Sequence, residues 1–244
     1  MGAKGRRKMP RRKKIVVNNN FFWIAAGFLF AGIFVYIFAA AIVSYPGFKV
    51  RRIEVNIDSS AGRQVRKFVQ GKSIFKVDRK KIRDAVIKQH PEVKDVFVIK
   101  KYPSSILIKI IERVPVLQFK MRKFYALDKE GVVVKENSGP AWQGLPLLSN
   151  RFLRENPFLG ENLSRYKTVK YALAILSVLE RENIPLARVS ALSVLGEYNI
   201  SFVLDGVKVI IDRKKASQEI AALVKIIMPR FAKDWGDIEY LDLR

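Results

Sequence analysis

The stretch that decides the architecture is FFWIAAGFLFAGIFVYIFAAAIV, Phe21–Val43, whose 23 residues include no charge. As a helix with a rise of about 1.5 Å per residue it would span about 34 Å, enough to cross a hydrocarbon core about 30 Å thick. A cleavable signal peptide is one alternative, and Ala39-Ala40-Ala41 leaves cleavage open, but signal peptides have a shorter apolar region. A buried helix of a soluble core rarely needs such length. We therefore predict a transmembrane helix over residues 21–45.

The residues before this stretch predict its orientation. Eight Lys and Arg residues and no acid lie within residues 1–20. By the positive-inside rule, this basic tail stays in the cytoplasm and the rest of the chain is exported. Trp23 and Tyr45 lie near the two ends of the helix, where aromatic side chains prefer the membrane interface. The sequence thus predicts a single-pass protein of the cytoplasmic (inner) membrane.

The charge of the exported part restricts the class of partner. The whole chain has 46 basic and 22 acidic residues, a net charge of +24, and the tail accounts for +8, which leaves +16 outside. A basic surface is typical of nucleic-acid binding, but no nucleic acid is expected outside the cytoplasm. A basic surface outside the cytoplasm can contact anionic lipid or acidic envelope polymers, and this is one hypothesis for the +16 charge. A solvated basic surface without a ligand is the simpler alternative.

The residue types that carry most enzyme chemistry are scarce. The chain has no cysteine and one histidine, His90, which precedes Pro91 at an expected helix end and is interpreted as a C-terminal cap. Phosphate loops, zinc signatures and nucleophile elbows are not found. The sequence therefore predicts a protein that is not an enzyme and has no metal or cofactor, against the alternative of a tethered envelope enzyme. The carboxylate pairs considered and set aside as surface acids are Glu161 with Glu180 or Glu182, and Asp234 with Asp237.

Residues 48–115 have the pattern of a small α+β domain in the order β-α-α-β-β. Strands are predicted from alternating or continuous apolar residues, and helices from apolar residues three and four apart behind a capping side chain. The predicted elements are a strand around Ile53–Ile57, helices from Ser59 or Ser60 to Gly71 and from Asp78 to the residues before Pro91, and strands Val93–Lys100 and Ile106–Ile111.

Residues 116–244 predict a mixed β-domain. Asp128-Lys129-Glu130-Gly131 reads as the loop of a hairpin, and Asp205-Gly206 is a strong two-residue hairpin signal. Three strands in succession, Val189–Leu195, Tyr198–Leu204 and Val207–Ile211, predict an antiparallel meander. Two amphipathic helices flank it, Ser164–Glu182 and Ala216–Phe231, each with one apolar face to pack on a sheet.

Several segments, taken in order, resemble a known family. Residues 48–115 resemble a POTRA (polypeptide-transport-associated) domain, and the ordered set resembles the FtsQ/DivIB family of bacterial cell-division proteins, including its C-terminal DLR element. Each motif is short, and their order along nearly the whole chain carries the resemblance. The segments are FKVRRIEV (48–55), FKVD (75–78), HPEVKDVFVIKKYPSSILIKIIERVP (90–115), YALDKEGVV (125–133) and IEYLDLR (238–244).

The resemblance implies a scaffold of the division machinery. Such proteins join FtsB/DivIC-like and FtsL-like single-pass proteins and other divisome components at the septum, and help recruit and regulate septal peptidoglycan synthesis. The POTRA unit is similar to the part used for recruitment, and the β-domain to the part that holds the FtsB-like partner. The residues independently favour a binding scaffold that adds a partner strand to a sheet edge. A POTRA-bearing secretion or envelope-assembly protein is the other alternative.

The last strand is the candidate partner-binding site, because chain order makes it the expected sheet edge. Tyr240 offers a large amphipathic contact, although period two does not single out a core face, and ordinary packing of a terminal strand is the alternative. Chains of this family generally continue past DLR into a further strand with much of the partner contact, so the resemblance leaves the docking of the partner strand open. The candidate residues are Ile238, Glu239, Tyr240, Leu241, Asp242, Leu243 and Arg244.

Overall fold

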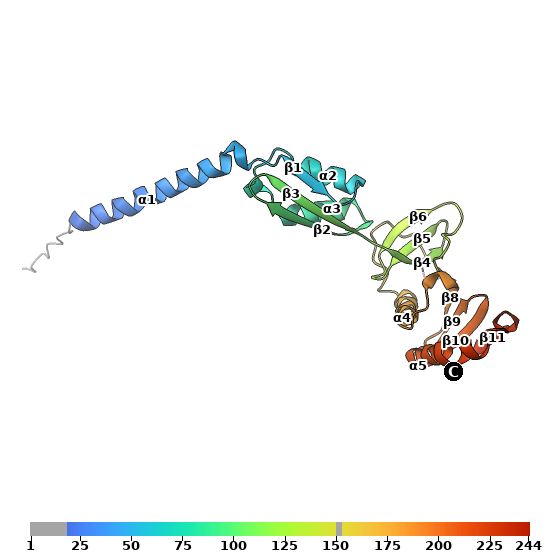
Figure 1. The fold of residues 1–244 in the computed structure, drawn as a ribbon. Coiled ribbons are helices and arrows are strands. Elements are labelled where there is room, and N and C mark those ends of the chain that lie inside the picture. The colour runs from blue at the N-terminus through green and yellow to red at the C-terminus, as the bar shows by residue number, and fades with distance from the viewer. Residues whose placement is uncertain (1–18, 150–152) are drawn as a thin grey trace, which may run out of the picture.

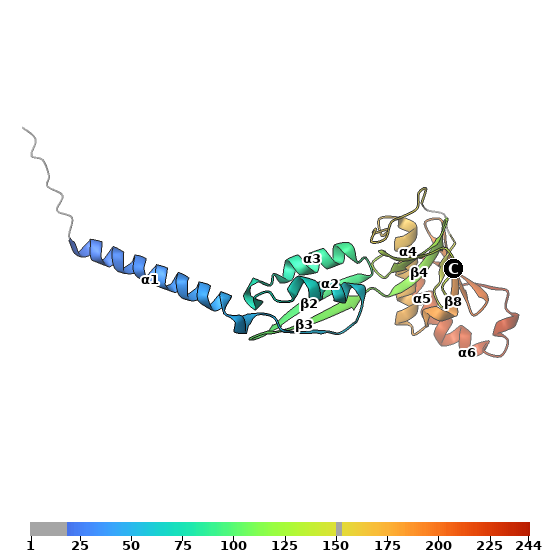
Figure 2. The ribbon, with the colours of Figure 1, turned by 90° about the horizontal axis from the view of Figure 1, so that it is seen from above.

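A computed structural model describes residues 19–149 and 153–244. In two views turned by 90°, a long helix leads into a unit built on a small sheet, and a unit built on a larger sheet follows at the far end (Figures 1 and 2). Among the described residues, these sheets have three and eight strands. The predicted basic tail lies almost entirely outside the described residues.

The N-terminal helix has the length and surface of a membrane span. It is α1, Asn19–Ser44, and among the described helices it alone is long and apolar enough to cross a bilayer, over Phe22–Ser44. Its large apolar side chains are exposed, as a helix surrounded by lipid requires, with Trp23 68% exposed. A short turn, Pro46–Phe48, follows α1 directly because proline cannot continue the helical hydrogen bonds.

The smaller unit has the predicted β-α-α-β-β order. In the sheet order β1-β3-β2, β1 is parallel and β2 antiparallel to the central β3. The side chains of Ser59 and Asp78 cap the two helices, accepting hydrogen bonds from Gly62 N at 3.2 Å and Lys80 N at 3.0 Å. The elements are β1 (Arg52–Val55), α2 (Ser60–Val69), α3 (Arg79–Gln89), β2 (Val93–Lys101) and β3 (Ser105–Glu112).

Both helices of the smaller unit cover one face of its sheet. Val65 and Val69 of α2 and Val86 of α3 are fully buried against the alternate residues of β3, such as Ile108. His90 caps α3 as predicted, its N–H donating to Val86 O at 2.8 Å. The apolar side chains that recur every 3.6 residues along the helices therefore pack against those that recur every second residue along the strands.

The larger sheet joins the predicted hairpin and meander into one layer. Its order is β11-β10-β9-β8-β7-β4-β5-β6, so the predicted antiparallel meander, β8-β9-β10, forms one half. Asp205 and Gly206 both have positive φ, as the tight turn between β9 and β10 requires. The strands are β4 (Pro115–Lys120), β5 (Phe124–Asp128), β6 (Val133–Asn137), β7 (Leu147–Leu148), β8 (Val189–Leu195), β9 (Asn199–Leu204), β10 (Val207–Asp212) and β11 (Tyr240–Asp242).

Two helical segments share one core with the larger sheet. The first, α4 (Lys167–Arg181), begins three residues later than predicted. The second begins as predicted with α5 (Ala216–Ala222), widens into a π-helical turn (Leu223–Ile227) and ends as α6 (Met228–Arg230). Pro229 explains the π-helical turn. It has no N–H to donate to the carbonyl four residues back, and its ring crowds that carbonyl. A wider turn moves the carbonyl away from the ring and no longer requires that hydrogen bond.

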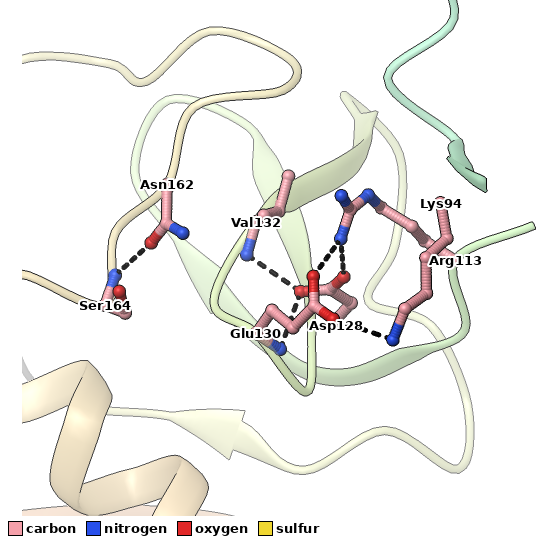
Figure 3. A network of polar contacts seen from close by, with 7 residues as sticks. All are labelled: Lys94, Arg113, Asp128, Glu130, Val132, Asn162 and Ser164. Carbon is pink, nitrogen blue, oxygen red and sulfur yellow. Dashed lines mark hydrogen bonds and ion pairs between the residues drawn. The ribbon is translucent and has the colours of Figure 1, made fainter. Parts of the chain in front are cut away.

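A polar network joins the two units (Figure 3). Arg113 leaves β3 and reaches the loop between β5 and β6, where it contacts Asp128 and donates to Glu130 Oε2 at 2.8 Å. From β2, Lys94 pairs with Glu130 Oε1 at 2.7 Å. The Asp128 side chain is almost fully buried and also accepts from Val132 N at 2.8 Å. These contacts link the smaller sheet to the hairpin loop of the larger one, so they help set the orientation of the two units.

The same hairpin loop is held from its other side. Gly131 has φ of +79°, and a Cβ there would lie 3.0 Å from Ser164 N. Leu163 N donates to Gly131 O at 2.8 Å. Asn162 Oδ1 accepts from Ser164 N at 2.8 Å (Figure 3). A residue with a side chain would meet both the steric limit and the unfavourable φ, so glycine is the residue that this loop needs.

Candidate partner-binding edge

The last strand, β11, lies at one edge of the larger sheet. It pairs in parallel with β10, with Tyr240 opposite Lys208 and Leu241 opposite Val209. In the part of the chain that the structure describes, no strand covers its outer side. The edge position predicted from chain order is therefore confirmed, although binding at this edge stays a prediction.

The segment before β11 is fastened to the sheet by an aromatic side chain. Trp235 packs against the core of the larger unit, and its Nε1 donates to Leu204 O at 3.4 Å. Ile238 N then donates to Trp235 O at 3.3 Å as the chain turns toward the edge. The segment between β10 and β11 is a crossover connection. Parallel pairing requires it, because the chain must return along the length of β10 before β11 can run in the same direction.

The two faces of β11 differ, which the alternating sequence pattern left open. Leu241 and Leu243 pack against the core, on the side of the fully buried Val209. Tyr240 is 58% exposed and Asp242 is exposed on the opposite face. Core packing therefore holds the strand through its leucines, while Tyr240 stays available for contact.

The backbone of β11 presents hydrogen-bonding groups to both sides. Leu243 N donates to Ile210 O at 3.0 Å, so the odd-numbered residues direct their N–H and C=O groups toward β10. Because these directions alternate along a strand, the N–H and C=O groups of Tyr240 and Asp242 point away from the sheet. These groups can pair with an added strand, and Tyr240 supplies both a backbone donor and an exposed side chain there.

A local ion pair shapes the end of the strand. Asp242 Oδ1 accepts from Arg244 Nε at 2.8 Å and from Arg244 N at 3.2 Å. These hydrogen bonds lower the pKa of Asp242 to about 2, with the side-chain bond as the largest cause. Asp242 therefore stays ionised down to strongly acidic pH. The end of the edge carries the negative charge of Asp242 and the positive charge of Arg244, and their hydrogen bonds hold the two side chains together.

A buried acid lies near this edge and was not singled out from the sequence. Glu219 of α5 is 8% exposed, and its Oε2 accepts from Asp212 N, at the end of β10, at 2.8 Å. Burial raises its pKa, and the negative charges of Asp212 and Asp242 add to the effect. Its position in the first turn of a helix reads as an ordinary helix-terminus charge, so the sequence offered no signal of its burial.

We expect Glu219→Gln to stabilise the fold slightly at neutral pH. A raised pKa means that the folded state binds the proton more tightly, so the ionised form costs stability above that pKa, and the cost vanishes below the ordinary pKa range of glutamate. The glutamine keeps an acceptor for Asp212 N and removes the buried charge. Thermal unfolding of the full chain in detergent should show a small gain at neutral pH that disappears in acid.

The control for this prediction is Glu219→Ala. Alanine leaves the partly buried Asp212 N without its acceptor, which costs up to the about 1–3 kcal/mol of a fully buried unsatisfied donor. We therefore expect a lower melting temperature for Glu219→Ala at every pH. A destabilised glutamine variant at neutral pH would contradict the inferred cost of the buried carboxylate.

Two of the carboxylates considered from sequence bind basic side chains in the structure, and Asp237 N donates to Asp234 O at 3.1 Å. Glu161 binds Arg165 at 2.7 Å, and Glu180 binds Lys129 at 2.6 Å, with the basic partner exposed in each pair. Among the described residues, no group of three or more His, Cys, Asp and Glu side chains is arranged to hold a metal ion. The candidate interaction site is the β11 edge, with its exposed Tyr240.

Comparison with known proteins adds an independent finding. The family model described as "Cell division protein FtsQ/DivIB, C-terminal" matches residues 116–244, and "POTRA domain, FtsQ-type" matches residues 48–113. A protein named Cell division protein FtsQ from Syntrophotalea carbinolica is 25% identical over 202 residues, which cover 80% of this chain and 70% of the relative. A second, from Rickettsia bellii, is 29% identical over 99 residues, 38% of this chain and 37% of the relative.

Proposed function

This chain belongs to the FtsQ/DivIB family of cell-division proteins, and from that premise we propose that it is a non-enzymatic scaffold of the divisome. In this proposal it binds FtsB/DivIC-like and FtsL-like single-pass proteins and helps recruit and regulate septal peptidoglycan synthesis. The observation that carries the proposal is the β11 edge, where Tyr240 combines an exposed side chain with outward backbone groups.

The proposed arrangement assigns different tasks to the parts of the chain. The tail over residues 1–20 stays in the cytoplasm and residues 21–45 cross the membrane, so the rest acts on the outer side of the cytoplasmic membrane at the division septum. The POTRA domain over residues 48–115 serves recruitment, and residues 116–244 hold the FtsB-like partner. The eight Lys and Arg residues of the tail, with no acid among residues 1–20, support this orientation.

The membrane anchor makes a weak edge contact sufficient. Confining two single-pass proteins to one membrane raises their effective concentration, so a second contact becomes nearly intramolecular. A short strand such as β11 would add few backbone hydrogen bonds, each contributing about 0.5–1.5 kcal/mol. The anchor and the edge therefore support each other in this proposal.

Recovery of partners from the native membrane tests the proposal. Tagged full-length protein is purified from detergent-solubilised membranes, and the bound proteins are identified by mass spectrometry, with an unrelated tagged single-pass protein as control. We expect small single-pass coiled-coil proteins together with septal synthesis enzymes. Recovery of secretion or outer-membrane assembly components instead would overturn the division role and favour the envelope-assembly alternative.

A further inference from the structure

Four aromatic rings line the end of the smaller unit where α1 enters it. Their centroids are 6.1 Å apart for Tyr45 and Phe48, 5.1 Å for Phe48 and Phe75, and 5.7 Å for Phe75 and Tyr102. Tyr45 and Tyr102 are 62% and 60% exposed, and Phe75 is 40% exposed. A row of aromatic rings this exposed is not explained by packing in the core of the smaller unit.

Backbone hydrogen bonds hold the three segments that carry these rings. Val50 N donates to Lys72 O at 2.9 Å, Gly71 N donates to Val50 O at 3.3 Å, and Arg51 N donates to Ser104 O at 2.9 Å. The chain that leaves α1 is thus tied both to the loop after α2 and to the turn between β2 and β3. We call this structure, residues 45–52, 70–80 and 99–105, the foot.

The foot is strongly basic. Its segments contain nine Lys and Arg residues and one acid, Asp78, whose carboxylate is occupied in capping α3. Eight of the nine basic residues are exposed, and Lys100 is partly exposed. Burial lowers the pKa of Lys100, and the positive charge of Arg79 lowers it further. Glu54, just outside these segments, pairs with Lys101 at 3.1 Å, so the foot joins exposed aromatic rings to a smaller but still large excess of positive charge.

The foot lies at the end of the helix that spans the membrane. Tyr45 N donates to Ile42 O at 3.2 Å and Phe48 N to Tyr45 O at 3.0 Å, so the turn that carries Tyr45 and Phe48 continues directly from α1. The larger unit lies at the opposite end of the smaller one (Figures 1 and 2). Aromatic side chains favour the headgroup level of a bilayer, and Lys and Arg near its surface are attracted to anionic lipid.

We propose that the foot binds the surface of the membrane that α1 crosses, with its aromatic rings at the headgroup level and its Lys and Arg side chains on the phosphates of anionic phospholipids. This contact holds the smaller sheet in one orientation relative to the membrane. The inference rests on α1 as a membrane span and does not require the proposed partner binding.

Labelled variants of the full chain test this inference, because the natural chain has no cysteine. A fluorophore is attached at Gln70→Cys, in the foot, or at Gln89→Cys, an exposed glutamine at the far end of α3. The chain is reconstituted in vesicles of phosphatidylcholine alone or mixed with phosphatidylglycerol, and a water-soluble quencher is added. We expect anionic vesicles to reduce quenching several-fold at Gln70→Cys only, and added salt to reverse part of this protection.

Charge and ring variants separate contact from mere proximity to the anchor. Lys72→Glu with Lys76→Glu, and Phe75→Ser with Tyr102→Ser, should each restore quenching at Gln70→Cys in anionic vesicles. Arg63→Glu with Lys88→Glu makes the same charge change on exposed residues away from the foot and should leave the protection intact. Equal quenching at Gln70→Cys in both kinds of vesicle, or protection that survives both foot variants, would overturn the inference. Partner recovery from membranes is measured separately, so each proposal can fail alone.

Discussion

Tyr240→Pro is expected to reduce recovery of the FtsB-like partner by at least about tenfold, a loss of about 1.4 kcal/mol. Proline removes the outward N–H of residue 240, worth about 0.5–1.5 kcal/mol, and its ring obstructs the approach of an added strand. The N–H groups of Leu241 and Leu243, which point toward β10, are untouched, so β11 stays in place. The measurement is the ratio of partner to bait in the membrane pull-down, with the α1 anchor intact.

Two further variants identify the cause of such a loss. Tyr240→Phe keeps the ring and the N–H group, so we expect it to retain most of the partner. Leu241→Pro removes an N–H that faces β10 and should detach β11 from the sheet, lowering thermal stability as well as binding. If Tyr240→Pro recovered as much partner as the natural chain, the partner strand would have to pair somewhere other than the β11 edge.

Local features of this fold were predictable because local chemistry determines them. The Asp78 cap of α3 follows from a carboxylate placed before a helical apolar pattern, and the Asp205-Gly206 turn needs positive φ at both residues, which glycine accepts without strain. The apolar span of α1 follows from length and composition alone. In each case a few neighbouring residues contain the whole signal.

Two central strands of the larger sheet were not predicted, and their physical setting explains why. β4 has four successive buried residues, Val116–Phe119, and so shows no period of two. β7 has only two residues, and it is held in place by parallel neighbours, β4 and β8, that are distant in the sequence. Non-local pairing of this kind leaves almost no trace in the sequence of the strand itself.

The candidate site was predictable in position but not in orientation. Chain order pointed to the last strand as an edge, whereas the alternating residues of that strand suit either face. The packing of Leu241 against the core, beside Val209, decides the question and exposes Tyr240. The burial of Glu219 is likewise a tertiary effect, because it depends on how α5 lies on the end of β10.

Arg113→Ala is expected to destabilise the full chain by about 2 kcal/mol and to loosen the junction between the two units. The Arg113 and Asp128 side chains are 13% and 5% exposed, so the pair lies between a surface ion pair, worth up to about 1 kcal/mol, and a buried one, whose disruption costs about 3–5 kcal/mol. Burial opposes the charge of Arg113, but its hydrogen bonds with Glu130 and Asp128 outweigh burial and raise its pKa. Thermal unfolding in detergent measures the loss of stability.

The junction itself is measured by the distance between spin labels on the two units. Lys67→Cys on α2 and Lys170→Cys on α4 place labels at exposed positions of a chain without natural cysteines. We expect a broader distance distribution for Arg113→Ala. Lys129→Ala is the matched control, because it removes one positive charge from the hairpin loop that Arg113 contacts, and Lys129 pairs with Glu180 inside the larger unit.

Lowering the pH should loosen the junction between the two units, as Arg113→Ala does, but to a smaller extent. Hydrogen bonds from Lys94 and then Arg113 lower the pKa of Glu130, so its contribution is complete above the ordinary pKa range of glutamate and is lost as the pH falls through its lowered value. The distance distribution of the natural chain should therefore broaden in acid, and that of Arg113→Ala should change less. An unchanged distribution and an unchanged melting temperature for Arg113→Ala would show that other contacts hold the two units together.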